Sequence, residues 1–151
     1  MTLTDEVIST LIEQIMGVLG SSISEEQITA LLKRLDSFGY TVTEDDVFSI
    51  CFSVQKVTQS IKNECNIQEI PDEHSCAVID MVCGEFLNVL YGAGKLALDT
   101  LDLDGAVTSV SLGNTKVTFE NGTSDEGKFF TLIGGLNARR GELICCRKLR
   151  W

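Results

Sequence analysis

The sequence predicts a mainly α-helical protein, namely a small helical bundle with a β-hairpin before a C-terminal helix and tail. Three observations lead to this fold class. Apolar residues recur every three or four positions along most of the N-terminal half, which is the spacing of amphipathic helices. The chain has a single proline, Pro71, so long helices can run without interruption. Finally, Gly113-Asn114 separates two short stretches of alternating apolar and polar residues, as in a tight hairpin.

The N-terminal region predicts two amphipathic helices. Residues 4–19 carry apolar side chains at helical spacing, so they form one apolar stripe. Ser24 followed by Gln27 has the form of a capping box and predicts a second helix over residues 24–38. Gly39 is placed to end that helix in the left-handed conformation.

Two longer helices are expected next. Thr43 and the acidic residues after it suit the first turn of a helix over residues 43–66. Pro71 suits the start of another helix over residues 71–92. The segment Cys76–Tyr91 is apolar almost all round, so we expect this helix to lie at the centre of a bundle or to be partly buried in an oligomer.

The C-terminal third is more varied. An acidic connection over residues 95–106 leads to the predicted hairpin at 107–120, whose strands are Val107–Leu112 and Lys116–Glu120. Ser124 is a candidate cap for a last helix within the C-terminal helix and tail, 124–151. The adjacent Gly134-Gly135 weakens that helix by about 1 kcal/mol per glycine relative to alanine.

Length and charge narrow the possible functions. The chain has 151 residues, which fits one domain, and its net charge is −10. A chain this acidic is poorly suited to neutralising the phosphates of nucleic acid or to binding an anionic membrane. It has neither the basic, apolar start of a signal peptide nor an uninterrupted apolar run of membrane-spanning length. We therefore expect a soluble protein of a reducing, cytoplasmic compartment.

Six cysteines and one histidine are the candidate metal ligands. The best set for zinc is Cys65, His74, Cys76 and Cys83. However, these residues lack a paired C-x-x-C spacing, and Cys76 and Cys83 fall on one apolar helix face. Burial of the cysteines in a core is therefore the preferred interpretation, with no metal. Zinc binding through these four residues remains the alternative.

No residues are marked out for catalysis, and the sequence predicts neither an enzyme nor a cofactor. His74 lies two residues from Cys76, and positions two apart on a helix point away from each other, which argues against a Cys–His dyad. Most of the paired carboxylates stand at predicted helix starts, where the helix dipole accounts for them. Neither a P-loop nor a G-x-G-x-x-G motif is present.

The C-terminal tail is the strongest candidate for a partner interface. It ends in Arg147-Lys148-Leu149-Arg150-Trp151, and Trp151 is the only tryptophan of the chain. Tryptophan and arginine are the residues most often found as interface anchors. A solvated tail is the alternative. The tip of the predicted hairpin, Gly113 and Asn114, is assigned to the same candidate interface.

Several sequence pieces together resemble a known family. They run in order from residue 31 to the C-terminus and comprise the helix ending in Gly39-Tyr40, the TEDD cap at 43–46, IKNECN at 61–66, Ile70-Pro71, VIDMVCGEFL at 78–87, VSLGNTKVTF at 110–119 and the closing RKLRW. This arrangement is similar to that of phage head–tail connector proteins of Gram-positive bacteria.

The resemblance implies a fold, an assembly and a location. The fold is packed helices with a small hairpin, and residues 23–151 form the connector domain, with 1–22 an additional N-terminal helix. The assembly is a self-associating, dodecameric ring at the neck of the virion, formed in the cytoplasm of the bacterial host. This ring joins the portal protein to head-closure or tail-terminator proteins, and double-stranded DNA passes through it without specific binding. Neither catalysis nor a cofactor is implied.

The residues alone leave a second hypothesis open, namely a small acidic cytosolic module that binds other proteins as a monomer or dimer. Its variant holds zinc through the four Cys and His residues named above. The oligomeric mass separates the two hypotheses, since the connector interpretation implies a ring.

Overall fold

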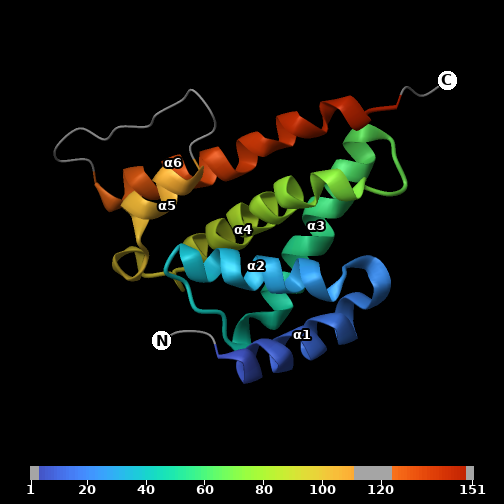
Figure 1. The fold of residues 1–151 in the computed structure, drawn as a ribbon. Coiled ribbons are helices and arrows are strands. Elements are labelled where there is room, and N and C mark those ends of the chain that lie inside the picture. The colour runs from blue at the N-terminus through green and yellow to red at the C-terminus, as the bar shows by residue number, and fades with distance from the viewer. Residues whose placement is uncertain (1–3, 111–123, 149–151) are drawn as a thin grey trace.

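The computed structural model describes residues 4–110 and 124–148, and in these ranges the chain forms six α-helices with short 3₁₀ segments between them (Figure 1). The mainly helical fold class is therefore confirmed. The α-helices are α1 (Asp5–Leu19), α2 (Glu25–Ser37), α3 (Val47–Cys65), α4 (Ser75–Gly92), α5 (Leu103–Val110) and α6 (Asp125–Ala138). The 3₁₀ segments are η1 (Gly20–Ser22), η2 (Glu44–Asp46), η3 (Asp72–His74), η4 (Leu98–Thr100) and η5 (Arg139–Cys146).

The predicted β-hairpin is not supported, because residues 107–110 belong to α5. The carboxylate of Asp102 accepts a hydrogen bond from the Gly105 N–H, 3.2 Å away, and so caps this helix at its start. Leu103, Ala106 and Val107 are buried at helical spacing. A run as short as 107–110 fits both the period of a strand and that of a helix, and here it continues the helix that begins at Leu103. The rest of the hairpin, with Gly113 and Asn114, lies outside the described residues.

The cap signals at the starts of α2 and α6 are confirmed. The Ser24 hydroxyl accepts from the Gln27 N–H at 3.2 Å, and the Gln27 side chain accepts from the Ser24 N–H at 3.0 Å, which completes the capping box. At the start of α6 the Ser124 hydroxyl accepts a hydrogen bond from the Gly127 N–H at 3.1 Å. Hydrogen bonds within one turn of the chain therefore fix where α2 and α6 begin, independently of how these helices pack.

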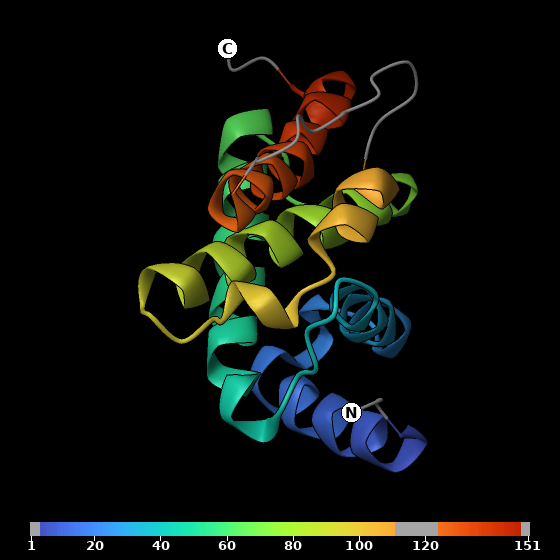
Figure 2. The same cartoon turned by 90° about the vertical axis from the view of Figure 1, so that its left-hand side faces the viewer.

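α4 is the central helix of the bundle, as its all-round apolar sequence predicts. It packs against α2, α3, α6 and η5, and both views place it between α6 and α2 (Figures 1 and 2). Of the described helices, the segment Asp72–Gly92 is the one with the length and apolar composition to cross a membrane, and half of its most apolar stretch is buried inside the protein. A core helix enclosed by other helices has the same composition.

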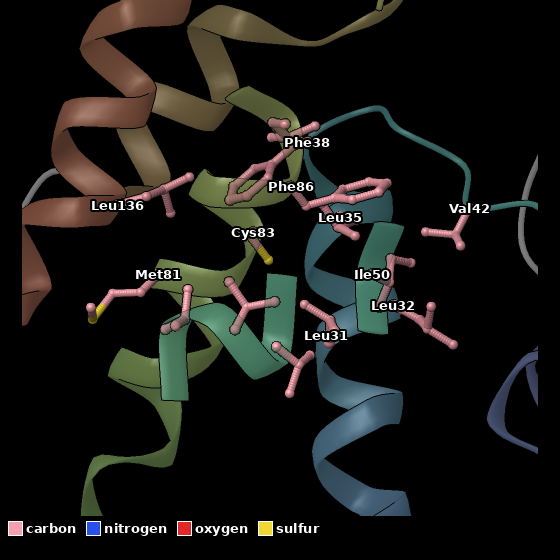
Figure 3. Close-up of a cluster of buried hydrophobic side chains, with 14 of the residues drawn as sticks. Leu31, Leu32, Leu35, Phe38, Val42, Ile50, Met81, Cys83, Phe86 and Leu136 are labelled. Carbon is pink, nitrogen blue, oxygen red and sulfur yellow. The ribbon is translucent and has the colours of Figure 1, made fainter. Parts of the chain in front are cut away.

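The core lies where α2, α3 and α4 meet. Leu31 and Leu35 of α2, Ile50 of α3 and Cys83 and Phe86 of α4 point toward one another there (Figure 3), and each is at most 1% exposed. α1 extends this core at one edge: its buried residues lie on one stripe, and the helix packs against α2, α3 and the η1 turn that follows it.

Two glycines allow close approaches that fix the packing. A Cβ at Gly84 of α4 would lie 3.1 Å from the Leu136 Cβ of α6, so the absence of a side chain lets the two helices approach. Gly39 has a φ of +93°, and a Cβ there would lie 2.9 Å from the Asp102 nitrogen. Asp102 in turn donates its N–H to the Phe38 carbonyl at 3.0 Å. Glycine is therefore required at position 39 both by conformation and by space.

Candidate partner interface

The charge of the chain is divided unequally along the sequence. Residues 139–151 contain five basic residues and one acidic residue. The other 138 residues hold the remaining seven of the 12 basic residues and 21 of the 22 acidic ones. A net charge of −14 on the body is thus joined to +4 on the C-terminal segment. Such asymmetry favours binding between the segment and an acidic surface.

The inner side of the C-terminal segment is fixed to the bundle by a buried carboxylate. Asp80, on α4, is 4% exposed. One of its oxygens accepts from Arg34 Nε of α2 at 2.9 Å, and the other accepts from an Arg139 guanidinium nitrogen at 2.7 Å. Two arginines compensate this buried negative charge. Without them, a carboxylate buried at this position would be strongly destabilising. The three residues tie α2, α4 and the start of η5 together.

Arg139 also forms a two-point ion pair with Glu142, at 2.6 and 3.1 Å. The hydrogen bond to Glu142, together with Asp80, raises the pKa of Arg139 although burial opposes this. The same hydrogen bond lowers the pKa of Glu142. This ion pair joins the first and fourth residues of η5 and so stabilises its first turn.

The end of η5 rests on the last turn of α3. Leu143 is buried, and its carbonyl accepts from the Cys65 thiol at 3.6 Å. The Lys148 N–H donates to the Cys65 carbonyl at 2.7 Å, which satisfies a carbonyl that the end of α3 leaves open. Arg140 pairs with Glu64 of α3. The backbone of the tail is therefore held in place as far as residue 148.

The outer side of the same segment is exposed. We call Ile144, Arg147 and Lys148 the basic surface. The Ile144 side chain is 71% exposed, and both basic residues are exposed. Beside it lies an open groove of about 730 Å³ between the tail and the loop that follows α3, lined by Asn66, Ile67, Gln68, Glu69, Pro71, Cys146, Arg147 and Lys148. An exposed isoleucine near two exposed cations is suited to contact with another protein.

A second exposed apolar surface lies at the opposite end of α3. Phe48 is 77% exposed and Phe52 is 56% exposed, and their rings stack with centroids 6.4 Å apart. Glu44 and Asp45, in the turn before α3, are exposed beside them in the sequence. We call these four residues the aromatic surface. Two stacked phenylalanines in solvent are unusual for a monomer and indicate an interface.

The structure places only part of the sequence-predicted interface. Arg147 and Lys148 are exposed on the basic surface, as an interface requires. Arg150 and Trp151, and the hairpin residues Gly113 and Asn114, lie outside the described residues.

The structure does not bring the four candidate zinc ligands together in one cluster. Among the described residues there is no group of three or more His, Cys, Asp and Glu side chains that could hold a metal. Cys65 and Cys83 are core residues, whereas Cys76 is exposed. The His74 ring contacts Glu73 at 3.6 Å. Desolvation by burial raises the pKa of the Cys83 thiol, and the negative charge of Asp80 raises it further. The thiol therefore stays neutral.

Sequence reasoning missed two features that each had a signal. Phe48 and Phe52 are four residues apart and off the apolar stripe of α3, which places them together on the outer face. Asp80 is a carboxylate within an apolar helix, which predicts a buried partner without identifying it. Arg34 and Arg139 are 46 and 59 residues away from it, so only the fold brings them together.

Comparison with protein-family models, with curated proteins and with solved structures gives no significant match to this chain. The assignment of an interface therefore depends on the charges, exposed side chains and contacts of the chain itself.

Proposed function

We propose that the protein is a structural head–tail connector that forms a ring at the neck of a phage or phage-like particle. In this role it joins the portal protein to head-closure or tail proteins and lets double-stranded DNA pass. It has no catalytic function and needs no cofactor. The sequence pieces that resemble connector proteins support the proposal, and those between residues 31 and 87 lie on α2, α3 and α4, which share one core, and on the turns that join these helices.

The observation that carries the proposal is the exposure of large apolar side chains at both ends of α3. The aromatic surface lies at the start of this helix, and Ile144 of the basic surface lies over its last turn. A subunit in a ring has a neighbour on each side and needs two different surfaces, whereas a two-fold dimer needs one.

A third exposed apolar surface is available for a different protein. Phe130 of α6 is 48% exposed and meets the Tyr91 ring of α4 edge-on at 5.6 Å, and Val89 of α4 is also exposed. Both views place α6 at the opposite end of the molecule from α1 and the start of α3 (Figures 1 and 2). This third surface suits a protein above or below the ring. The acidic body suits DNA passage, because like charges keep DNA from binding.

Negative-stain electron microscopy of the purified protein tests the proposal, alone and mixed with the portal protein of the same phage or prophage. We expect rings, or added density beneath the portal. A chain that ends at Cys146 is the comparison variant, and we expect it to stay folded and to lose assembly. If the full chain gives neither rings nor added density, the connector proposal is wrong and the acidic interaction module takes its place. Unfolding of the shortened chain would instead place the tail in the core.

A further inference from the structure

We propose that the basic surface of one copy binds the aromatic surface of a second copy, so that the chains associate head to tail. This inference rests on the proposed function, and it names the two faces that meet between neighbouring subunits. The juxtaposition that carries it is the position of two complementary surfaces at opposite ends of one helix, α3.

The two surfaces match in charge and in apolar content. Glu44 and Asp45 provide two negative charges next to two phenylalanine rings, and Arg147 and Lys148 provide two positive charges next to Ile144. The described ranges give no ion pair to any of these four charged side chains. Arg139 and Arg140 differ, since each is paired inside its own molecule. The positive charge of Arg147 and Lys148 on the tail is therefore complementary to the negative charge of Glu44 and Asp45 at the start of α3.

The two surfaces of one molecule cannot meet each other. α3 has 19 residues and is therefore about 28 Å long at ~1.5 Å per residue. Its start carries the aromatic surface, and the Lys148 N–H is bonded to the carbonyl of Cys65, its last residue. Contact between the surfaces thus requires a second copy.

A two-fold dimer through either surface is excluded by charge. Pairing two aromatic surfaces would bring four carboxylates together, and pairing two basic surfaces would bring four cations together. Like charges facing each other across an interface repel strongly. The remaining contact joins unlike surfaces. When each copy uses its two surfaces on two different neighbours, this contact is heterologous, and it gives a closed ring when its rotation closes and a filament when it does not.

Charge reversal on each surface tests this contact. E44K/D45K makes the aromatic surface basic, and R147E/K148E makes the basic surface acidic. All four residues are exposed, so the fold should survive, which circular dichroism checks. By sedimentation velocity, from micromolar to millimolar protein at low salt, we expect each double variant to associate at least about tenfold more weakly than the wild type.

The decisive result is rescue. An equimolar mixture of the two double variants should associate again, because unmodified surfaces meet each other and reversed surfaces meet each other. The quadruple variant should associate for the same reason. The control E13K/D99K alters the net charge by the same amount as E44K/D45K at two other exposed positions, and it should behave as the wild type. F48A/F52A should also weaken association, and mixing it with E44K/D45K should not restore it, because neither chain then carries an intact aromatic surface.

Three results would overturn the inference: a wild-type chain that stays monomeric at millimolar concentration, double variants that associate as the control does, or failure of the mixture and the quadruple variant to recover. Its failure is distinct from failure of the connector proposal. If rings on the portal persist in both double variants, the connector proposal stands and this contact is wrong. If charge rescue succeeds but the full chain gives neither rings nor added density beneath the portal, the contact stands and the connector proposal is wrong.

Discussion

α4 and α1 are both regular helices, but they meet the rest of the protein in different ways. α4 buries nine of its 18 residues and is covered on several sides, whereas α1 buries four of its 15 residues along one stripe. α4 also carries Asp80 into the interior, which requires Arg34 and Arg139 to reach it. In α1 every polar side chain has a solvent-facing position available. A central helix therefore depends on several elements at once, whereas an edge helix depends on the packing of one face.

The first prediction uses the same substitution in both helices. Leu87 in α4 and Leu11 in α1 are each 0% exposed. We expect Leu87→Ala to lower the free energy of unfolding by about 4 kcal/mol and Leu11→Ala by about 3 kcal/mol, because an edge helix can move to close a cavity and an enclosed helix cannot. Urea denaturation followed by circular dichroism measures both. Equal losses, or a larger loss in α1, would contradict the difference between the two helices.

The second prediction concerns the buried carboxylate of the central helix. Asp80→Ala leaves Arg34 and Arg139 without their shared partner, and we expect a loss of about 3 kcal/mol in the free energy of unfolding. The matched control, Glu64→Ala, breaks the exposed pair with Arg140 and should cost under ~1 kcal/mol. Both are measured by urea denaturation. The triple variant R34M/D80L/R139M should recover much of the loss if the cost comes from unpaired charge.

The two helices also differ in how much of their role is readable from sequence. The stripe of α1 and the all-round apolar character of α4 predict edge and centre positions, because periodicity reports how many sides a helix buries. The capping box at Ser24 fixes the start of α2 in the same local way. These features depend on residues at most a few positions apart, which is why sequence reasoning finds them.

The errors and omissions depend on distant residues. The alternation from Val107 predicts a strand, yet this segment packs as the helix α5 against α6, and its cap, Asp102, is also hydrogen-bonded to Phe38, 64 positions earlier in the chain. The Asp80 ion pairs join three elements. For the candidate interface, sequence identified the cationic tail but not its separation from Phe48 and Phe52 by the length of α3. That separation is a property of the packed chain.

The third prediction gives opposite signs in the two helices. Gly84 of α4 faces α6 so closely that a Cβ would lie 3.1 Å from the Leu136 Cβ, whereas a Cβ at Gly17 of α1 has no neighbour within 4 Å. We expect Gly84→Ala to destabilise the protein by ~1–2 kcal/mol through overpacking. Gly17→Ala should stabilise it by ~0.5–1 kcal/mol, since alanine restricts the unfolded chain and favours helix. Thermal unfolding of both variants measures the signs. Stabilisation by Gly84→Ala would mean that α4 and α6 are not tightly packed.

The smallest expected effect concerns Glu142 of η5, whose partner Arg139 also pairs with Asp80 of the central helix. The hydrogen bond with Arg139 lowers the pKa of Glu142, so Glu142 stabilises the fold when ionised. A carboxyl group whose pKa is lowered by folding adds to the free energy of unfolding at pH values above its pKa in the unfolded chain, which is about 4.3. This stabilisation is lost as the pH falls through the pKa of the folded protein. The Glu142 side chain is 44% exposed, so we expect Glu142→Gln to cost only ~0.5 kcal/mol at about pH 7 and nothing at about pH 2.

Urea denaturation of the wild type and the variant across this pH range measures the difference. Glu13→Gln on α1, at an exposed position with no ion pair in the described ranges, should show no pH-dependent difference from the wild type. A Glu142→Gln cost that stays constant down to about pH 2 would show that the amide disturbs packing, because a charge effect must disappear once the carboxylate is protonated. The ion pair with Arg139 would then contribute nothing measurable, and the hold on the tail would rest on Asp80, Leu143 and the bond from Lys148 to Cys65.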